Sequence, residues 1–134
     1  MDNKQGLSYS EIRQAILDKI PAQVGITRIE FEGPRLAIYC QKPEFLQENS
    51  HIVGEIAGII KKRIVIRSDP SVRIGEIQAE DIIKEIISEA GLVQAYFDPA
   101  LGEVVLEVEK PGVAIGKGGS NVVEIVKKTH WSPN

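Results

Sequence analysis

The chain has 134 residues, of which 43% are hydrophobic and 26% are charged, and its formal net charge is −3. Such a composition is typical of a soluble globular protein with one domain or two small ones. It excludes a membrane span, which needs roughly 18 apolar residues in a row, and a protein that binds nucleic acid through its overall charge. Because the polar N-terminus has no signal-peptide core, we expect a cytoplasmic location.

The first half of the chain predicts the order helix, strand, strand, helix, helix, strand. Ser8 and Glu11 form a capping-box pair before apolar residues at helical spacing. The later segments alternate or repeat at helical spacing between Gly and Pro breakers. In chain order we expect a helix through Ile20, strands around 29–31 and 36–40, a short helix around Phe45, a longer helix over 52–60 and a strand over 63–67.

The second half repeats this order with small insertions. Gly25-Ile-Thr-Arg-Ile-Glu-Phe31 corresponds to Gly91-Leu-Val-Gln-Ala-Tyr-Phe97, and Lys42-Pro43 returns as Lys110-Pro111. Pro70 and Gly75 are breakers between the two copies. In chain order we expect a helix over 82–87, strands over 93–97 and 104–108, a turn of helix after Pro111 and a helix through 122–126.

A Gly-Lys-Gly-Gly turn at 116–119 separates the last two expected helices. Gly116 and Gly119 permit close backbone approach, and Lys117 adds a cation beside the amides of a helix N-terminus. K-homology (KH) modules hold the backbone of about four nucleotides with such a loop. The helix and strand order around the turn is that of the type II KH arrangement, which favours this interpretation over a plain strand-to-helix turn.

Basic and apolar residues surround the turn. From Lys110 to Lys128 the only carboxylate is Glu124, so this region is a positive patch in an acidic chain. Leu106 and three further apolar residues either line a groove for unpaired bases or pack in the core. Few aromatic residues are available for a stacking platform. The residues that we predict to bind RNA are Lys110, Val113, Ile115, Gly116, Lys117, Gly118, Gly119, Ser120, Val122, Lys127 and Lys128.

We therefore predict an α+β fold with two tandem type II KH-like domains, each with a three-stranded sheet packed on helices. Residues 1–68 form a degenerate KH-like domain without Gly-x-x-Gly, 69–78 a linker, and 79–134 a KH domain with the loop. The last strand falls on 129–133, where a proline removes a ladder donor, and is expected to be short or truncated. We expect the chain to be a fragment of a longer protein.

The first copy lacks the glycines of the loop. Ser50-His-Ile-Val53 stands opposite Gly-Lys-Gly-Gly, and Glu44 and Glu48 precede it. Carboxylates repel phosphates and β-branched residues resist the required backbone, so we expect this copy to pack or position rather than bind. The basic residues at 61–63 and Arg67 either contact an RNA backbone or complement a helix dipole.

Catalytic and metal-binding patterns are absent from the sequence. The two histidines, His51 and His130, are far apart and not part of a His-x-His-x-Asp-His motif, and Gly-x-Ser-x-Gly and P-loop spacings do not occur. Cys40, the single cysteine, is predicted to be a buried core residue. Trp131 is expected to cover the second core or to meet a downstream domain. We expect no enzyme, metal or cofactor within these residues.

Five blocks of the chain resemble one family. They are Glu30-Phe-Glu-Gly-Pro34, Lys62-Arg-Ile-Val-Ile-Arg-Ser-Asp-Pro-Ser71, Gly102-Glu-Val, Lys110-Pro-Gly-Val-Ala-Ile-Gly-Lys-Gly-Gly119 and Thr129-His-Trp-Ser-Pro133. They are similar to the N-terminal tandem KH region of archaeal homologues of the cleavage and polyadenylation specificity factor nuclease. The family pattern usually has glycine at the position of His130.

That resemblance implies a role at RNA 3′ ends. It implies a module that presents single-stranded, U-rich RNA to downstream metallo-β-lactamase and β-CASP domains, which cut RNA with zinc. Processing, decay and transcription termination are the implied settings, and the partners include those domains and a homodimer of the parent protein. Two alternatives remain: a stand-alone tandem KH transcription factor similar to NusA, and a protein-interaction or dimerisation module whose glycine loop is structural.

Overall fold

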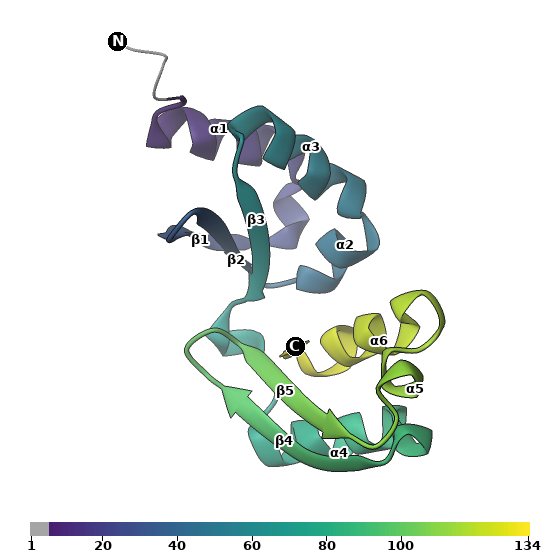
Figure 1. Cartoon of the computed structure of the whole chain (residues 1–134). Coiled ribbons are helices and arrows are strands. Elements are labelled where there is room, and N and C mark those ends of the chain that lie inside the picture. The colour runs from purple at the N-terminus through teal and green to yellow at the C-terminus, as the bar shows by residue number, and fades with distance from the viewer. Residues whose placement is uncertain (1–5) are drawn as a thin grey trace. The chain divides into compact units, whose positions relative to one another are not determined.

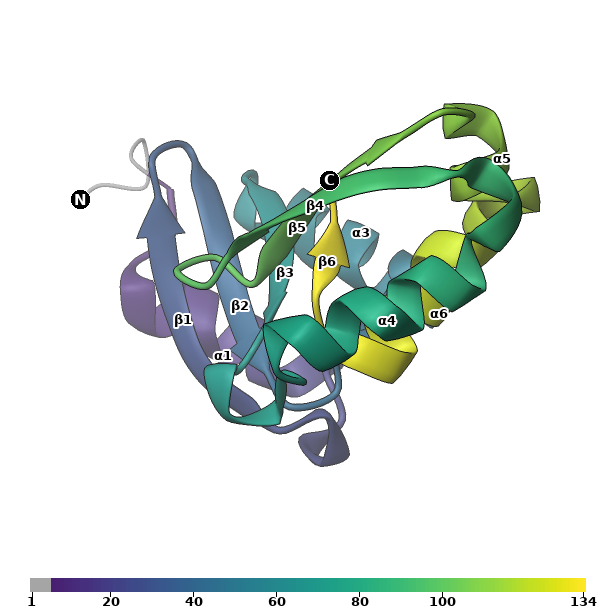
Figure 2. The same cartoon turned by 90° about the horizontal axis from the view of Figure 1, so that it is seen from below.

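The computed structural model describes residues 6–134, and the chain forms two compact units that divide between Ile66 and Arg67. Each unit has a three-stranded sheet with helices packed on it (Figures 1 and 2). The predicted α+β class is confirmed, and the fold is consistent with a KH-like arrangement. Within residues 6–134, no helix is both long enough and apolar enough to cross a membrane.

The first unit begins with α1 (Tyr9–Lys19), whose N-cap is the predicted Ser8. The Ser8 hydroxyl accepts a hydrogen bond from the Glu11 amide at 3.2 Å, and the Ser8 amide donates to the Glu11 carboxylate at 2.9 Å. The hydrogen bond from the Ser8 amide lowers the pKa of the Glu11 carboxyl most, and the hydrogen bond with the Ser8 side chain lowers it further. The capping box therefore holds the first turn of α1 in the way its sequence predicts.

The other elements of this unit follow the expected order. They are a 3₁₀ turn (Ala22–Val24), β1 (Ile26–Glu32), β2 (Arg35–Cys40), α2 (Pro43–Glu48), α3 (Ser50–Ile60) and β3 (Arg63–Ser68). The sheet order is β1-β2-β3, with β1 antiparallel to β2. Ile64 and Ile66 of β3 pack against the core that contains Ile38 and Cys40. Because Cys40 is fully buried among apolar side chains, its predicted core role is confirmed.

The second unit repeats this plan from α4 onward. Its elements are α4 (Glu76–Ile86), a 3₁₀ turn (Ser88–Ala90), β4 (Leu92–Asp98), β5 (Glu103–Val108), α5 (Pro111–Ile115), a 3₁₀ turn (Lys117–Gly119), α6 (Ser120–Thr129) and β6 (Ser132–Pro133). Helices α4 and α6 lie side by side against the sheet (Figure 2). Strand β6 has two residues and runs parallel to the central strand β5.

The last two residues of β3, Arg67 and Ser68, and the segment that follows them belong to the second unit and are bonded within it. Arg67 donates to the Leu101 carbonyl and forms an ion pair with Glu103 at 2.8 Å, with only 1% of its side chain exposed. The Ser68 hydroxyl donates to the His130 carbonyl, and Trp131 Nε1 donates to the Ile74 carbonyl at 2.7 Å. Residues 69–78, expected as a linker, therefore include a 3₁₀ turn (Pro70–Val72) held against this unit and the first turn of α4.

Trp131 lies in the core of the second unit. It is 4% exposed, and its ring meets Phe97 edge-on with 4.9 Å between centroids. The Arg73 guanidinium lies 5.6 Å from the Trp131 ring centroid. The core role expected for the only tryptophan is therefore confirmed, while its indole N–H adds a bond that the sequence could not indicate.

The last helix of each unit, α3 or α6, is followed by a C-cap residue with left-handed backbone angles. Lys61 follows α3 with φ 60°, and His130 follows α6 with φ 61°. Such positions favour glycine, since a side chain there costs about 1 kcal/mol or more. The ring of His130 also forms a hydrogen bond with the Val72 carbonyl at 2.9 Å, which gives this histidine a structural role.

Replacing Arg67 with alanine is expected to lower the free energy of unfolding by about 3 kcal/mol, because a partly buried carboxylate loses its charged partner. Chemical denaturation followed by Trp131 fluorescence reports this unit. The control is Lys128→Ala, which removes the exposed pair with Glu124 and should lower the same free energy by about 0.5 kcal/mol. Equal effects of the two changes would contradict a special role for Arg67.

Substituting glycine at the two left-handed positions should separate strain from bonding. Lys61→Gly is expected to raise stability by about 0.5 kcal/mol, because relief of strain exceeds the added chain entropy. His130→Gly relieves the same strain but removes the bond to Val72, so it should bring no gain. Thermal unfolding measures both, and a larger gain at His130 than at Lys61 would show that the ring bond contributes nothing.

Candidate nucleic-acid interface

The glycine loop connects α5 to α6 through three left-handed residues. Gly116, Gly118 and Gly119 have φ values of 79°, 63° and 77°. Gly116 combines its φ with ψ 169°, a region that only glycine adopts readily. The turn therefore depends on glycine for its backbone path, as the sequence pattern predicts.

Gly116 is also the crowded position of the loop. A Cβ built on Gly116 would lie 2.8 Å from Ser120 Oγ and 3.0 Å from the Asn121 amide group. The Asn121 side chain donates to the Val113 carbonyl at 3.1 Å and so ties the start of α6 to α5. In contrast, a Cβ on Gly118 or Gly119 would meet nothing within 4 Å. The tip of the loop is open to an incoming group while its base is packed.

Asn121 was missed in the sequence-based set of site residues. An amide side chain directly after Gly-Gly-Ser at a helix start is a usable signal, because Asn commonly bonds nearby backbone there. Ser120, which was predicted, is exposed and begins α6. No side chain caps the N-terminus of α6, whose N-cap is Gly119. At the positive end of the α6 dipole, beside the loop, no side chain therefore caps the first amides.

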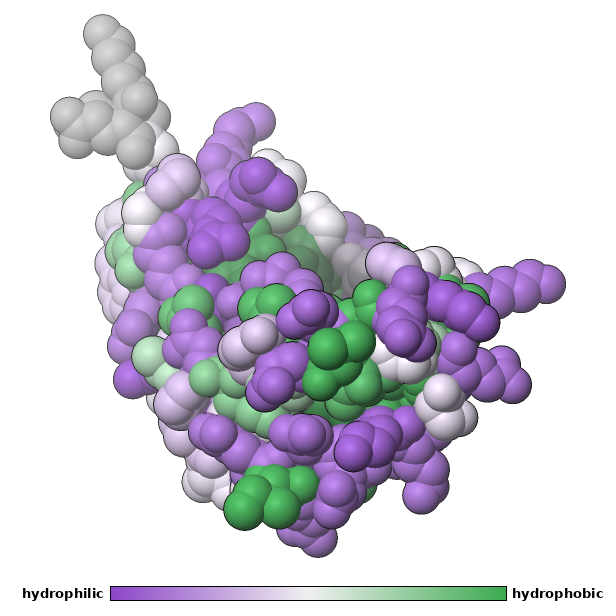
Figure 3. Space-filling model, turned by 60° about the horizontal axis from the view of Figure 1, so that its bottom comes forward, coloured by the Kyte–Doolittle hydropathy of each residue, from purple (hydrophilic) through white to green (hydrophobic). Residues whose placement is uncertain are grey.

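The structure divides the predicted cations: Lys117 is in the loop and Lys110 precedes α5, whereas Lys127 and Lys128 lie in the last turn of α6, at the end away from the loop. Lys110, Lys117 and Lys127 are exposed, and none of them forms an ion pair within the described part of the chain. Lys128 forms an exposed pair with Glu124 at 3.0 Å. Hydrophilic residues cover most of the face drawn in Figure 3, with hydrophobic residues in separate patches. Lys117 at the loop tip is the cation best placed to meet a phosphate.

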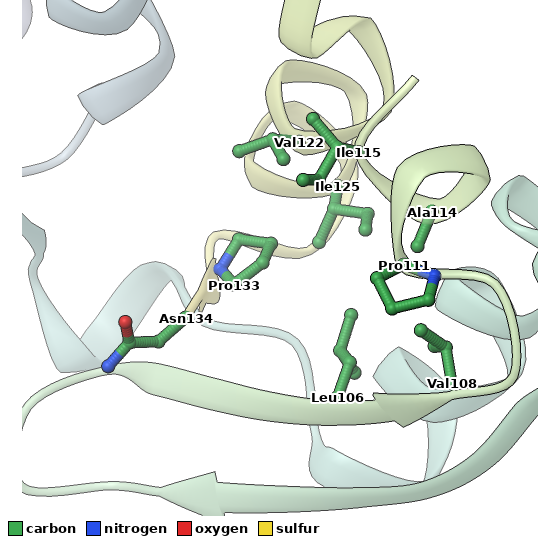
Figure 4. A pocket seen from close by; sticks show the side chains of 9 residues that line it. All are labelled: Leu106, Val108, Pro111, Ala114, Ile115, Val122, Ile125, Pro133 and Asn134. Atoms are coloured by element: carbon green, nitrogen blue, oxygen red, sulfur yellow. The ribbon is translucent and has the colours of Figure 1, made fainter.

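An apolar groove of about 280 Å³ lies beside the loop (Figure 4). Leu106 and Val108 point into it from β5, opposite side chains from α5 and α6, while the Asn134 amide points away. Ile115, 52% exposed, and Val122 line it as expected. Val113 does not line this groove, because the turn of α5 directs it to another hollow with Ile86, Glu89 and Asn121. The predicted apolar set is thus divided between two surfaces.

The first unit can be compared with the second at the position of this groove. The β-strand registers align Leu106 and Val108 with Ile38 and Cys40, both fully buried. In the first unit, Ile64 and Ile66 of the six-residue strand β3 pack against the core that contains both residues. In the second unit, β6 has two residues. The two units therefore differ both in the length of the third strand and in the loop, and the groove of Figure 4 lies beside the shorter strand.

The first unit has a helix junction in place of the loop. Asn49 separates α2 from α3 with φ −123°, and its side chain donates to the Phe45 carbonyl at 2.8 Å. Glu48, at the end of α2, is exposed nearby. This junction offers neither left-handed glycines nor a lysine at its tip. Arg67, considered as an RNA contact, is buried in its pair with Glu103 and is not accessible.

Metal chemistry has no ligand set in the described residues. Residues 6–134 contain no group of three or more His, Cys, Asp or Glu side chains that could hold a metal ion.

Comparison with known proteins adds a family. A family model described as the KH domain of transcription termination factor FttA matches residues 7–73, half of the chain. Transcription termination factor FttA of Thermococcus kodakarensis is 41% identical over 124 residues, and that of Methanothermobacter thermautotrophicus is 44% identical over the same length. Both alignments cover 92% of this chain.

The relatives are much longer than this chain. It spans 19% and 20% of those two proteins, and the FttA of a Lokiarchaeum strain is 36% identical over 95% of this chain and 20% of its own length. The crystal structure of APE1850 aligns with 89% of this chain and 84% of its own at 20% identity and a TM-score of 0.36, too low to identify a common fold.

Alanine substitutions at the two ends of the loop should differ in their effect on stability. Gly116→Ala is expected to lower the free energy of unfolding by about 3 kcal/mol, because it adds a clash to backbone strain. Gly118→Ala adds strain alone, about 1 kcal/mol. Denaturation followed by Trp131 fluorescence measures both. If the Gly118 change were the more damaging one, the crowded and open ends of the loop would be wrongly assigned.

Proposed function

The chain belongs to the family of KH domains of transcription termination factor FttA, and we propose that it is a single-stranded RNA-binding module that acts in transcription termination. The observation that carries the proposal is the loop at 116–119, with its left-handed glycines and exposed Lys117. The names of the relatives support termination as the setting.

RNA binding at the loop follows from its geometry and charge. Gly118 and Gly119 let a sugar-phosphate backbone approach the loop without a side chain in the way. The uncapped N-terminus of α6 offers positive potential to a phosphate, and Lys117 adds a mobile cation at the tip. Since the whole chain carries −3 charges, this attraction is local and sensitive to salt.

The proposal includes a tandem type II KH arrangement with a division of roles. Both units follow the same order of helices and strands, and only the second has the glycine loop within residues 6–134. The second unit binds the RNA backbone at residues 110, 113, 115–120, 122, 127 and 128, with Val113 on the far side of α5 from the groove. The first unit positions the module or the RNA, and its junction at Asn49 does not act as a phosphate clamp.

A finer part of the proposal concerns the longer protein. The family blocks support a zinc-dependent metallo-β-lactamase and β-CASP ribonuclease as the parent, for which this module selects U-rich RNA near transcript 3′ ends in the cytoplasm. The cutting chemistry then belongs to downstream domains of the same polypeptide, in a parent protein that forms a homodimer. Residues 1–134 supply recognition and orientation rather than a catalytic group.

Direct binding measurements test the loop. Fluorescence anisotropy with a labelled oligouridine should show that Lys117→Glu and Gly118→Asp each weaken binding roughly tenfold, because each places a carboxylate beside a phosphate. The dependence of log affinity on log salt should become shallower by about one for Lys117→Glu. Because Gly118 faces open space, the altered loop can keep its fold, which thermal unfolding verifies.

Two matched controls accompany these variants. Lys84→Glu makes the same charge change at an exposed site on α4, and Ser50→Asp adds a carboxylate at the junction in the first unit. Neither should change affinity more than twofold. If both loop variants bind like the unaltered chain at every salt concentration, the loop is structural and the protein-interaction alternative replaces the proposal. Loss of affinity in the controls as well would indicate non-specific charge attraction.

A further inference from the structure

Two half-exposed aromatic rings stand together at one end of the first unit. Tyr9 begins α1 and is 47% exposed, and Phe31 lies near the end of β1 and is 50% exposed. Their ring centroids are 6.4 Å apart and their planes are tilted by 57°. Phe31 is on the same face of β1 as the buried Ile29, yet half of its surface is exposed. Its ring emerges at the strand end.

These rings are held in place rather than free. The Tyr9 hydroxyl donates to the Ile29 carbonyl at 3.4 Å, and the capping box fixes the helix turn that carries Tyr9. Lys62 Nζ lies 5.5 Å from the Phe31 ring centroid, within the range of a cation–π contact. A base that stacked on this surface would therefore meet rings that are already ordered, so less side-chain entropy is lost on binding.

The charge next to the rings is positive and unpaired. Lys61, Lys62 and Arg63 follow one another directly after α3, and within residues 6–134 none of them forms an ion pair. Carboxylates on the neighbouring elements are already engaged with other groups. The pairs are Glu11 with Ser8, Glu30 with Arg28 at 3.0 Å, and Glu32 with Arg35 at 3.9 Å.

Another exposed tyrosine of the chain lacks this setting. Tyr96, on β4 of the second unit, is 55% exposed, but its hydroxyl donates to the Glu107 carboxylate at 3.4 Å. A carboxylate beside a ring repels a phosphate that would accompany a stacked base. Ring exposure alone therefore does not define the surface at Tyr9 and Phe31. Its distinguishing feature is the combination of two rings with three consecutive cations.

We propose that Tyr9, Phe31 and Lys62 form a second RNA contact, at which an unpaired base stacks on the rings and its phosphate meets the cations at 61–63. Aromatic rings with adjacent cations bind single strands in this way, largely without regard to sequence. The inference rests on the proposed function only in taking RNA as the ligand, because it does not involve the glycine loop. It gives the first unit a binding role that its lost loop does not provide.

The test replaces the rings while keeping apolar bulk. In anisotropy titrations with labelled oligouridine, the double variant Tyr9→Leu and Phe31→Leu should weaken binding about tenfold, the effect of losing one stacked base. Lys62→Glu, which leaves both rings in place, should also weaken binding and flatten its salt dependence. Tyr96→Leu is the matched control and should change affinity less than twofold. Thermal unfolding confirms that each variant is folded.

Combination with the loop variant separates the two proposals. In a Gly118→Asp background, the ring variants should weaken the residual binding further, and a 4-thiouridine probe should crosslink to a peptide that contains Tyr9 or Phe31. If neither the ring variants nor Lys62→Glu changes the affinity for RNA, the surface is not an RNA site. The exposed rings would then be a surface for binding a protein. If only Gly118→Asp weakens RNA binding, this inference is overturned and the loop proposal is supported. If only the ring variants weaken RNA binding, this inference is supported and the loop proposal is overturned.

Discussion

The conformation of the glycine loop is the constraint on which the rest of the second unit's surface depends. Gly116 has backbone angles that other residues adopt only with strain, and its neighbours Ser120 and Asn121 leave no room for a side chain. This tight base fixes where α6 begins, and the N-terminus of that helix has no side-chain cap. The exposed lysine and the open glycines at the tip follow from that start point. The chemistry of the loop is thus a consequence of backbone geometry more than of any single charged side chain.

Periodicity and breakers were sufficient to predict the order of helices and strands. The capping box at Ser8 and the Gly-x-x-Gly pattern could be read locally, because their partners lie within a few residues. The burial of Arg67 could not, since its partner Glu103 is 36 residues away and an arginine at a strand end looks exposed. For the same reason, the segment after β3 looked like a linker although its bonds to Thr129, His130 and Trp131 hold it in the second unit.

In the candidate sites too, features set by residues close in sequence could be predicted, whereas features set by residues far apart in sequence could not. The glycines and Lys117 could be named from sequence because the turn is self-contained. Val113 was misplaced because one turn of a short helix decides which side of α5 it faces. The exposure of Phe31 could not be predicted, because alternation reveals which face of a strand a residue is on but not where the covering helices end. Pairing of Phe31 with Tyr9 required the fold to bring α1 beside β1.

The open and crowded ends of the loop have a consequence for how such a module can change over time. A residue at position 118 meets empty space, whereas one at 116 meets α6. Mutations at the tip can therefore alter affinity for a ligand at little cost in stability, whereas mutations at the base lower the stability of the domain. A duplicated copy can drift through the first kind of change without being eliminated by misfolding. The first unit, which keeps the scaffold but has a plain helix junction at Asn49, has the form that such a history would leave.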